Sequence, residues 1–160
     1  MVEIDLAHLL DIEDVNTYKF HAAVWNGQRH PLDAYVKDGR KAGEKGSDWW
    51  YWQAWYKYPR WEDAKYILSF MQVYPEGKNV WLFGGIFEIK GLNIPPGKEK
   101  EEGDFYDVNL TEKGQQWIGR LKITIPYEDT RKYPDLSKVY SDIKFREILK
   151  EPYWCSATKN

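Results

Sequence analysis

Residues 65–90 decide the fold, and they read KYILSFMQVY (65–74), PEGKN (75–79) and VWLFGGIFEIK (80–90). Two runs rich in β-branched and aromatic residues flank a segment of proline, glycine and asparagine, which is the pattern of a β-hairpin. Gly84 and Gly85 interrupt the second run, and glycine inside a strand indicates a bulge or a close backbone approach. The stretch therefore predicts two antiparallel strands in a sheet that bends at the glycine pair.

Further strands and short helices are predicted on both sides of this hairpin. Runs that favour strands occupy residues 18–25, 105–110, 117–125 and 143–149, of which the last also suits a short helix. Short helices are predicted over residues 5–15, 30–36 and 137–141. We therefore expect an α+β fold, in which a curled, mostly antiparallel sheet or small open barrel carries flanking helices.

The length of 160 residues and the apolar content of 42% predict one compact domain. Within it, we expect residues 1–46 to form a helical and loop extension packed on an aromatic-rich core of residues 47–150. The sequence has no run of about 18 apolar residues, and its N-terminus lacks the basic-then-apolar order of a signal peptide. These features favour a cytoplasmic protein with no membrane partner.

The cysteine and histidine content argues against a disulfide and against a metal site. Cys155 is the single cysteine, and His8, His21 and His30 have no cysteine partners at zinc-site spacing. Most carboxylates lie in polar stretches, where solvated surface is the ordinary role. We therefore expect no metal, no cofactor and no catalytic residues in this chain.

Aromatic side chains gather in a tryptophan segment, residues 48–61, which reads DWWYWQAWYKYPRW. Eight of its fourteen residues are aromatic, and it holds five of the nine tryptophans of the chain. The aromatic residues of this segment follow neither a helical nor a strand period, so the pattern does not separate a buried face from an exposed one. We therefore expect some of these rings to lack a core in which to pack. Exposed rings stack on nucleic-acid bases or surround a cation, whereas the alternative is that they are core and edge packing.

The residues themselves suggest how a nucleic acid would be held. Rings of the tryptophan segment would stack on a base, and Asp107, within an aromatic strand, would accept from an exocyclic amine. The net charge of −2 does not draw the whole molecule to a polyanion, but local cations can contact phosphates. The candidate phosphate-binding residues are Lys57, Arg60, Lys65, Arg120, Lys122 and Arg131.

Several short motifs carry a resemblance to a known family. They are Trp52-Gln53, the stretches 64–70 and 81–89, Tyr106-Asp107-Val108, and Ile118-Gly119-Arg120-Leu121. Over residues 48–149, the chain resembles an N-terminal domain found ahead of GIY-YIG nuclease domains in bacterial restriction-type proteins. Gly84-Gly85-Ile86 is similar to the first tripeptide of those nucleases, but the second tripeptide is absent, so the chain itself is not predicted to be an enzyme.

The domains of that family are similar to the PUA-like group, which includes EVE, YTH and SRA readers. The resemblance implies a curled sheet whose cleft accepts a base, often one flipped out of a duplex. It also implies that Ser69, Phe70, Trp81 and Phe83 lie near the cleft, with the tryptophan segment at its rim. The complete set of candidate base-binding residues is then Trp49, Trp50, Trp52, Trp55, Tyr56, Ser69, Phe70, Trp81, Phe83 and Asp107.

The leading hypothesis is a DNA-binding reader of a modified, flipped base. Such a domain would be the specificity module of a modification-dependent restriction endonuclease, with the nuclease domain in the same parent protein. One alternative is an RNA-binding PUA-like module. Another is a protein-interaction domain that uses the tryptophan segment as its interface. DNA is favoured over RNA as the partner.

Overall fold

The computed structural model describes residues 5–54 and 59–158. A six-stranded sheet has the order β1-β2-β3-β5-β6, with β4 paired to β3 beside this path. All strand pairs are antiparallel except β1 and β2, which are parallel. The strands are β1 (Tyr18–Ala23), β2 (Tyr66–Gln72), β3 (Val80–Leu92), β4 (Tyr106–Leu110), β5 (Leu121–Thr124) and β6 (Lys144–Ile148). The expectation of an α+β protein with a mostly antiparallel open sheet is confirmed.

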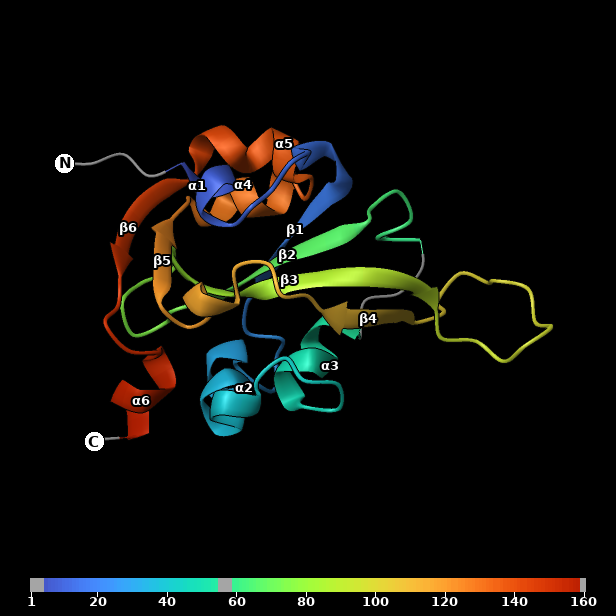
Figure 1. Ribbon diagram of the computed structural model, residues 1–160, viewed down its shortest axis with the longest axis horizontal. Coiled ribbons are helices and arrows are strands. Elements are labelled where there is room, and N and C mark those ends of the chain that lie inside the picture. Colours follow the sequence, from blue (N-terminus) through green and yellow to red (C-terminus); the bar gives the residue numbers. More distant parts are fainter. Residues whose placement is uncertain (1–4, 55–58, 159–160) are drawn as a thin grey trace.

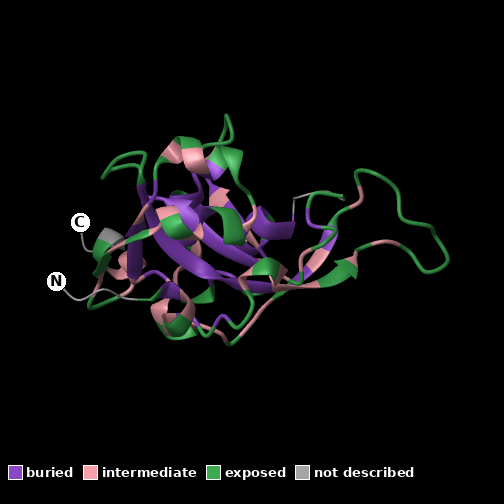
Figure 2. Ribbon diagram, turned by 90° about the horizontal axis from the view of Figure 1, so that it is seen from above, coloured by how far each residue is buried: buried purple, intermediate pink, exposed green. Residues whose placement is uncertain are grey.

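Helices lie on both faces of this sheet, as Figure 1 shows. One face carries α1 (Leu6–Leu9), α4 (Tyr127–Lys132) and α5 (Leu136–Val139). The other face carries α2 (Pro31–Asp38), α3 (Asp48–Ala54) and α6 (Tyr153–Thr158). Short 3-10 helices are η1 (Val15–Thr17), η2 (Gly39–Lys41), η3 (Gln115–Trp117) and η4 (Tyr140–Asp142). Strands β1, β2, β3 and β5 are largely buried between these layers, whereas β6 has no buried residue and the loop between β3 and β4 projects into solvent (Figure 2).

Each face of the sheet has its own hydrophobic cluster. Side chains alternate along β2, so Ile67 and Met71 join the cluster under α2 and α3. Leu68 and Phe70 point the other way and join the cluster under α1 and α5. The sheet therefore separates two cores, and residues that are neighbours in sequence lie on opposite sides of it.

β3 forms a fork, because two different strands pair with one of its edges. β5 pairs with Val80–Leu82 at the start of β3, and β4 pairs with Phe87–Leu92 at its end. Carbonyl oxygens in the gap accept from other groups: that of Phe83 from the Gly119 N–H, and that of Ile86 from the Thr111 N–H, both at 2.8 Å. The connection between β4 and β5 thus satisfies backbone groups that no strand covers.

Gly84 is the extra residue of a β-bulge in this fork. Ser69 pairs with Gly85 and Phe70 with Phe83, so Gly84 has no partner in β2. The indole N–H of Trp49 donates to the Gly84 carbonyl at 2.8 Å, and a Cβ atom on Gly84 would lie 2.3 Å from the Trp49 ring. The predicted bulge and close approach are confirmed, and the approaching group is a tryptophan.

Two expectations about the N-terminal third of the chain differ from the structure. Residues 1–46 are predicted to form an extension, but the described part of this stretch, residues 5–46, supplies strand β1 of the sheet and helix α2 of one covering layer. The helix predicted over 5–15 is only the short α1, followed by η1. Parallel pairing of β1 with β2 is a long-range contact, and local sequence patterns do not reveal it. Within the described ranges, no helix has the length and apolar character needed to cross a membrane.

Candidate functional site

The candidate site is a pocket at the outer edge of β1, the edge strand of the sheet. Its volume is about 160 Å³, and an apolar cavity of about 150 Å³ is large enough to hold benzene. β1, the turn at 59–64, and α4 with the loop that follows it supply the walls. The lining residues are Phe20, His21, Ala22, Arg60, Trp61, Thr130, Arg131 and Pro134. The pocket therefore has room for one small planar ring.

The interior of the pocket is buried, and its mouth is cationic. Phe20, His21 and Trp61 are each at most 3% exposed, whereas Arg60 and Arg131 are exposed. The guanidinium of Arg131 lies 5.0 Å from the Tyr127 ring centroid, and its Nε donates to the Tyr127 hydroxyl at 3.0 Å. Aromatic and imidazole rings thus form the deep part of the site, and two guanidinium groups stand at the entrance.

Trp61 is fixed from both its backbone and its ring. Its N–H donates to the hydroxyl of Tyr106 at 2.9 Å, in a buried hydrogen bond that ties the turn to β4. Its ring lies edge-on to His21, with centroids 6.0 Å apart. The Arg60 guanidinium lies 5.7 Å from the Trp61 ring centroid. The turn at 59–64 is therefore held in place by contacts on two sides.

His21 belongs to a buried polar cluster with Gln53 and Ser69. Nδ1 of His21 lies 2.6 Å from Oε1 of Gln53, and the Ser69 hydroxyl donates to the same oxygen at 2.7 Å. The Gln53 amide nitrogen donates to the Trp49 carbonyl at 3.0 Å. Burial lowers the pKa of His21 to about 4, against the opposing effect of the Gln53 hydrogen bond, and the charges of Arg60 and Arg131 add to the lowering. His21 is therefore neutral at pH 7.

Backbone groups of β1 also face the pocket. The N–H of Phe20 donates to the Pro134 carbonyl at 2.6 Å, so Phe20 turns its backbone away from β2. In a strand, backbone direction alternates from residue to residue, which gives Ala22 the same outward direction. Ala22 lines the pocket, so its N–H and carbonyl can read the edge of a planar ligand.

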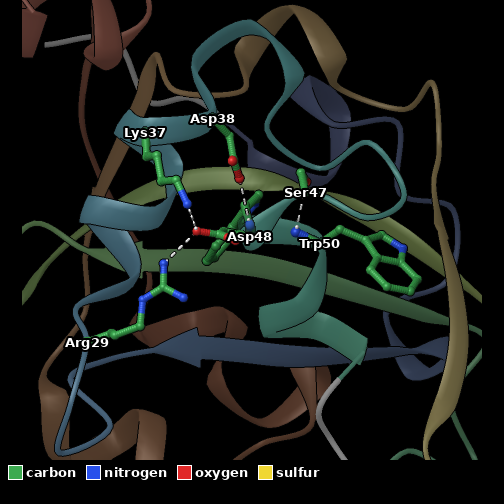
Figure 3. Close-up of polar contacts among 7 residues, drawn as sticks. Arg29, Lys37, Asp38, Ser47, Asp48 and Trp50 are labelled. Carbon is green, nitrogen blue, oxygen red and sulfur yellow. Dashed lines mark hydrogen bonds and ion pairs between the residues drawn. The ribbon is translucent and has the colours of Figure 1, made fainter.

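Helix α3, which carries Gln53, is anchored by side chains at its N-terminus (Figure 3). Asp48 accepts from Arg29 Nη2 at 2.7 Å and from Lys37 Nζ at 2.9 Å, and these two hydrogen bonds lower the pKa of Asp48. Asp38 accepts from the Trp49 N–H at 2.8 Å, and the Ser47 hydroxyl accepts from the Trp50 N–H at 3.2 Å. These contacts satisfy helix N–H groups that have no partner within the helix.

The fold places most of the candidate base-binding residues inside the protein. Trp49, Trp50 and Trp52 are buried in the cluster under α2 and α3, with the indoles of Trp49 and Trp50 donating to backbone carbonyls. These three rings therefore have a core to enter, because α3 packs against the sheet beside α2, whereas Tyr51 of the same helix is 40% exposed, in line with the expectation that some rings of the segment lack a core. Trp55, Tyr56 and Lys57 lie outside the described residues.

The remaining base-binding candidates do not meet in one cleft. Phe70, Trp81 and Phe83 are fully buried in the cluster on the opposite face from Trp49. Asp107 is partly exposed on β4, where it forms an ion pair with Lys45 at 3.5 Å. Ser69 does contribute to the site, but from behind His21, through the hydrogen bond to Gln53.

Of the candidate phosphate-binding residues, Arg60 and Arg131 meet at the pocket. Lys122 is buried and forms ion pairs with Glu76 at 2.5 Å and Glu147 at 3.3 Å. Arg120 donates to the carbonyls of Leu149 and Gln116. Lys65 is exposed, with its Nζ 5.5 Å from the Tyr66 ring centroid. Arg120 and Lys122 thus hold parts of the protein together, and the expectation that they reach a phosphate is not supported by their contacts.

Sequence reasoning missed His21, Gln53 and Trp61 as a group. A signal was present, because Gln53 and Ser69 are polar residues inside strongly apolar runs, and buried polar side chains need partners. Their common partner, His21, is distant in the sequence and becomes visible only when β1 pairs with β2.

A larger pocket of about 290 Å³ lies between α1 and strands β5 and β6, but it offers fewer polar or charged groups to a ligand. Its lining is mainly aliphatic and aromatic, and its polar members, Asp5 and Tyr140, bond to each other. Across residues 5–54 and 59–158, no three His, Cys, Asp or Glu side chains gather closely enough to hold a metal ion. The pocket beside β1 is therefore the better candidate.

Comparisons with protein-family models, with curated proteins and with solved structures found no match for this chain. Its function must therefore be argued from the geometry of the site.

Proposed function

We propose that the protein is a nucleic-acid reader that accepts one flipped base in the pocket beside β1. The observation that carries this proposal is the order of groups along the pocket, from buried rings at the floor to Arg60 and Arg131 at the mouth. A nucleotide has the same order, since its base is planar and its phosphate is an anion. Base and phosphate would each meet a group of matching chemistry.

The size and lining of the pocket support a base as the occupant. A volume of about 160 Å³ suits one ring better than a bulky peptide side chain with its backbone. Trp61 and His21 offer aromatic contact, and Ala22 offers backbone groups to the base edge. Stacking contributes about 1–3 kcal/mol per base, which can offset the few kcal/mol that unstacking costs.

The cations at the mouth support phosphate binding despite the net charge of −2. Both arginines are close enough to His21 to lower its pKa, so their fields converge on the pocket. Guanidinium groups bind phosphate oxygens through paired N–H donors. A local positive field of this kind is sufficient for binding at one phosphate or two.

The wider identity of this reader follows from the sequence resemblance. A PUA-like domain that recognises a modified base in DNA, as the specificity module of a restriction endonuclease, is our leading assignment. The open sheet with helices on both faces is compatible with it. A nuclease domain in the parent protein would then supply the cutting activity.

The test is fluorescence anisotropy with short labelled duplexes at several salt concentrations. The panel holds unmodified DNA and DNA with 5-methylcytosine, 5-hydroxymethylcytosine or N6-methyladenine, together with single-stranded DNA and RNA of the same sequence. We expect one modified duplex to bind most tightly. Replacing both arginines, R60A with R131A, should flatten the plot of log K against log salt by about 2, because each phosphate contact on B-DNA contributes about 0.9.

The matched control is Arg40→Ala, since Arg40 is an exposed arginine in η2, away from this pocket. It should leave affinity and salt dependence unchanged. Equal loss in Arg40→Ala and in the double variant would show that the pocket is not the binding site. Tighter binding of the RNA strand would favour the RNA-binding alternative, and no binding by any strand at low salt would refute the reader.

A further inference from the structure

The larger pocket, here called the α1 pocket, lies between α1 and strands β5 and β6 and shares no lining residue with the pocket beside β1. Leu6, Leu121 and Ile123 form its floor, and each is at most 7% exposed. Its walls are three half-buried apolar side chains, those of Leu9, Ile143 and Phe145. Its volume is about 290 Å³, whereas an apolar cavity of about 150 Å³ already holds benzene. The α1 pocket therefore has room for an aromatic ring with a short chain.

One exposed carboxylate, that of Asp5, stands at the rim of the α1 pocket. Oδ1 of Asp5 accepts from the hydroxyl of Tyr140 at 2.5 Å and from the N–H of Ala7 at 3.0 Å. The Tyr140 hydroxyl in turn accepts from the same N–H at 2.8 Å. These contacts hold the carboxylate through one of its oxygens. The other oxygen, Oδ2, has no hydrogen-bond or ion-pair partner among residues 5–54 and 59–158.

The hydrogen bonds at Oδ1 favour the charged form of this carboxylate. The bond from Tyr140 is the main cause that lowers the pKa of Asp5, and the bond from the Ala7 N–H adds to it. Tyr140 has a single proton and donates it to Asp5, and the other lining side chains are apolar. The α1 pocket therefore offers a ligand apolar walls and one anion, a combination that attracts an apolar cation and repels an anion.

We propose that the α1 pocket binds a small amphipathic amine, whose apolar group lies on the floor and whose ammonium group contacts Oδ2 of Asp5. The direction follows from the geometry, because the apolar side chains are deep and the charge is at the rim. A lysine side chain has the reverse order and would carry its ammonium group onto an apolar floor. The proposal does not depend on base binding, since the two pockets have no residue in common.

Three probes that share one phenylethyl group test the preference for a cation. They are 2-phenylethylamine, 2-phenylethanol and 3-phenylpropanoate, which carry an ammonium, a hydroxyl and a carboxylate. We expect the amine to bind about fivefold more tightly than the alcohol, because an ion pair at an exposed carboxylate contributes modestly, and the carboxylate probe to bind more weakly than the alcohol. Titrations followed by ¹H–¹³C spectra of methyl groups also locate the probe, and the shifts should centre on Leu6, Leu121 and Ile123.

Asp5→Asn connects this preference to the carboxylate. Asparagine also caps helix N-termini, so the variant should keep α1 and its affinity for the alcohol, but the amine should lose its advantage. The matched control is Asp14→Asn, because Asp14 caps η1 through the same kind of hydrogen bond, from the Asn16 N–H at 3.0 Å, and does not line the pocket. This control should keep the preference for the amine.

Salt tests the same contact in the wild type, without any variant. The advantage of the amine over the alcohol should shrink as the ionic strength rises toward about 1 M, because screening weakens an ion pair between exposed charges. Equal affinity of amine and alcohol in the wild type at low salt would overturn the inference, and so would an unchanged preference in Asp5→Asn. Shifts centred away from the α1 pocket, or no binding of any probe at millimolar concentration, would also overturn it.

Two further comparisons fix the ligand class and the independence of the site. L-phenylalaninamide adds a carboxamide where a peptide chain would continue, and we expect it to bind no more tightly than 2-phenylethylamine. Tighter binding would assign the pocket to the N-terminus of a peptide and overturn the small amine as its ligand. The double variant R60A with R131A should retain amine binding, so failure of this proposal and failure of the base reader give different results.

Discussion

At the scale of single residues, folding keeps His21 neutral by removing the water that an imidazolium needs. Burial is the main cause of its low pKa, with the two arginines adding to it. The unfolded chain has no such constraint, and its imidazole titrates near 6.5. Between these two pKa values, the imidazole is protonated in the unfolded state and neutral in the folded state. Acidification therefore favours unfolding.

We predict that this residue makes the protein less stable as pH falls from about 6.5 to about 4. The pKa of His21 in the folded protein is about 4, and each unit of difference corresponds to about 1.4 kcal/mol, so the loss approaches 3 kcal/mol. Urea unfolding across this range measures it. Carboxylates contribute to the same slope, so the comparison is with His21→Gln, whose stability should fall less steeply. Parallel slopes in both proteins would contradict the prediction.

At the scale of elements, α3 and β3 are fitted to each other through one tryptophan and one glycine. The Trp49 ring lies where a Cβ atom of Gly84 would be, and its indole satisfies a carbonyl in the fork of β3. The helix thus closes a gap that neither β4 nor β5 covers. This is the physical reason for the glycine at the bulge.

Gly84→Ala should destabilise the protein by about 2 to 4 kcal/mol, from overpacking and from the loss of the indole hydrogen bond. Chemical denaturation measures the change. Trp49→Phe removes the ring atoms that the new methyl group would meet, so the double variant should be more stable than the sum of the single changes implies. Additive effects would show that the close approach is not the cause.

Sequence patterns predicted the helices and strands more accurately than they predicted the contacts between these elements. The alternation in 65–90 and the glycine pair indicated β2, β3 and the bulge, since these depend on neighbouring residues. The aromatic run did not indicate which face of α3 holds Trp50 or Trp52, because α3 packs against both the sheet and its neighbour α2. Arg60 and Arg131 were found as cations, but their meeting place at His21 depends on a turn and a helix that are far apart in the chain.

At the scale of the whole molecule, the two cores share the same strands. β2 and β3 send alternate side chains into both clusters, so neither cluster can lose its packing while the sheet remains intact. We therefore predict a single unfolding transition. Tryptophan fluorescence and far-UV circular dichroism should give the same midpoint in urea.

Leu68→Ala tests this coupling from one face. Leu68 is fully buried in the cluster under α1 and α5, which also holds Trp81, whereas four other tryptophans, Trp49, Trp50, Trp52 and Trp61, lie in the other cluster and dominate the fluorescence signal of that face. The loss of about 2–5 kcal/mol expected for a buried leucine should lower the midpoint equally by both probes. A fluorescence midpoint that stays in place while the dichroism shifts would show that the two faces unfold separately.

The pocket beside β1 joins three segments that are distant along the chain: a strand, a turn and a helix with its loop. A ligand that contacts all three segments can bind only the folded protein. Its binding free energy therefore adds to the free energy of unfolding. At a ligand concentration 100-fold above Kd, the gain is about 2.7 kcal/mol. Melting temperature thus becomes an assay of occupancy that requires no label on protein or ligand, and a library of nucleosides and nucleotides can be ranked by it.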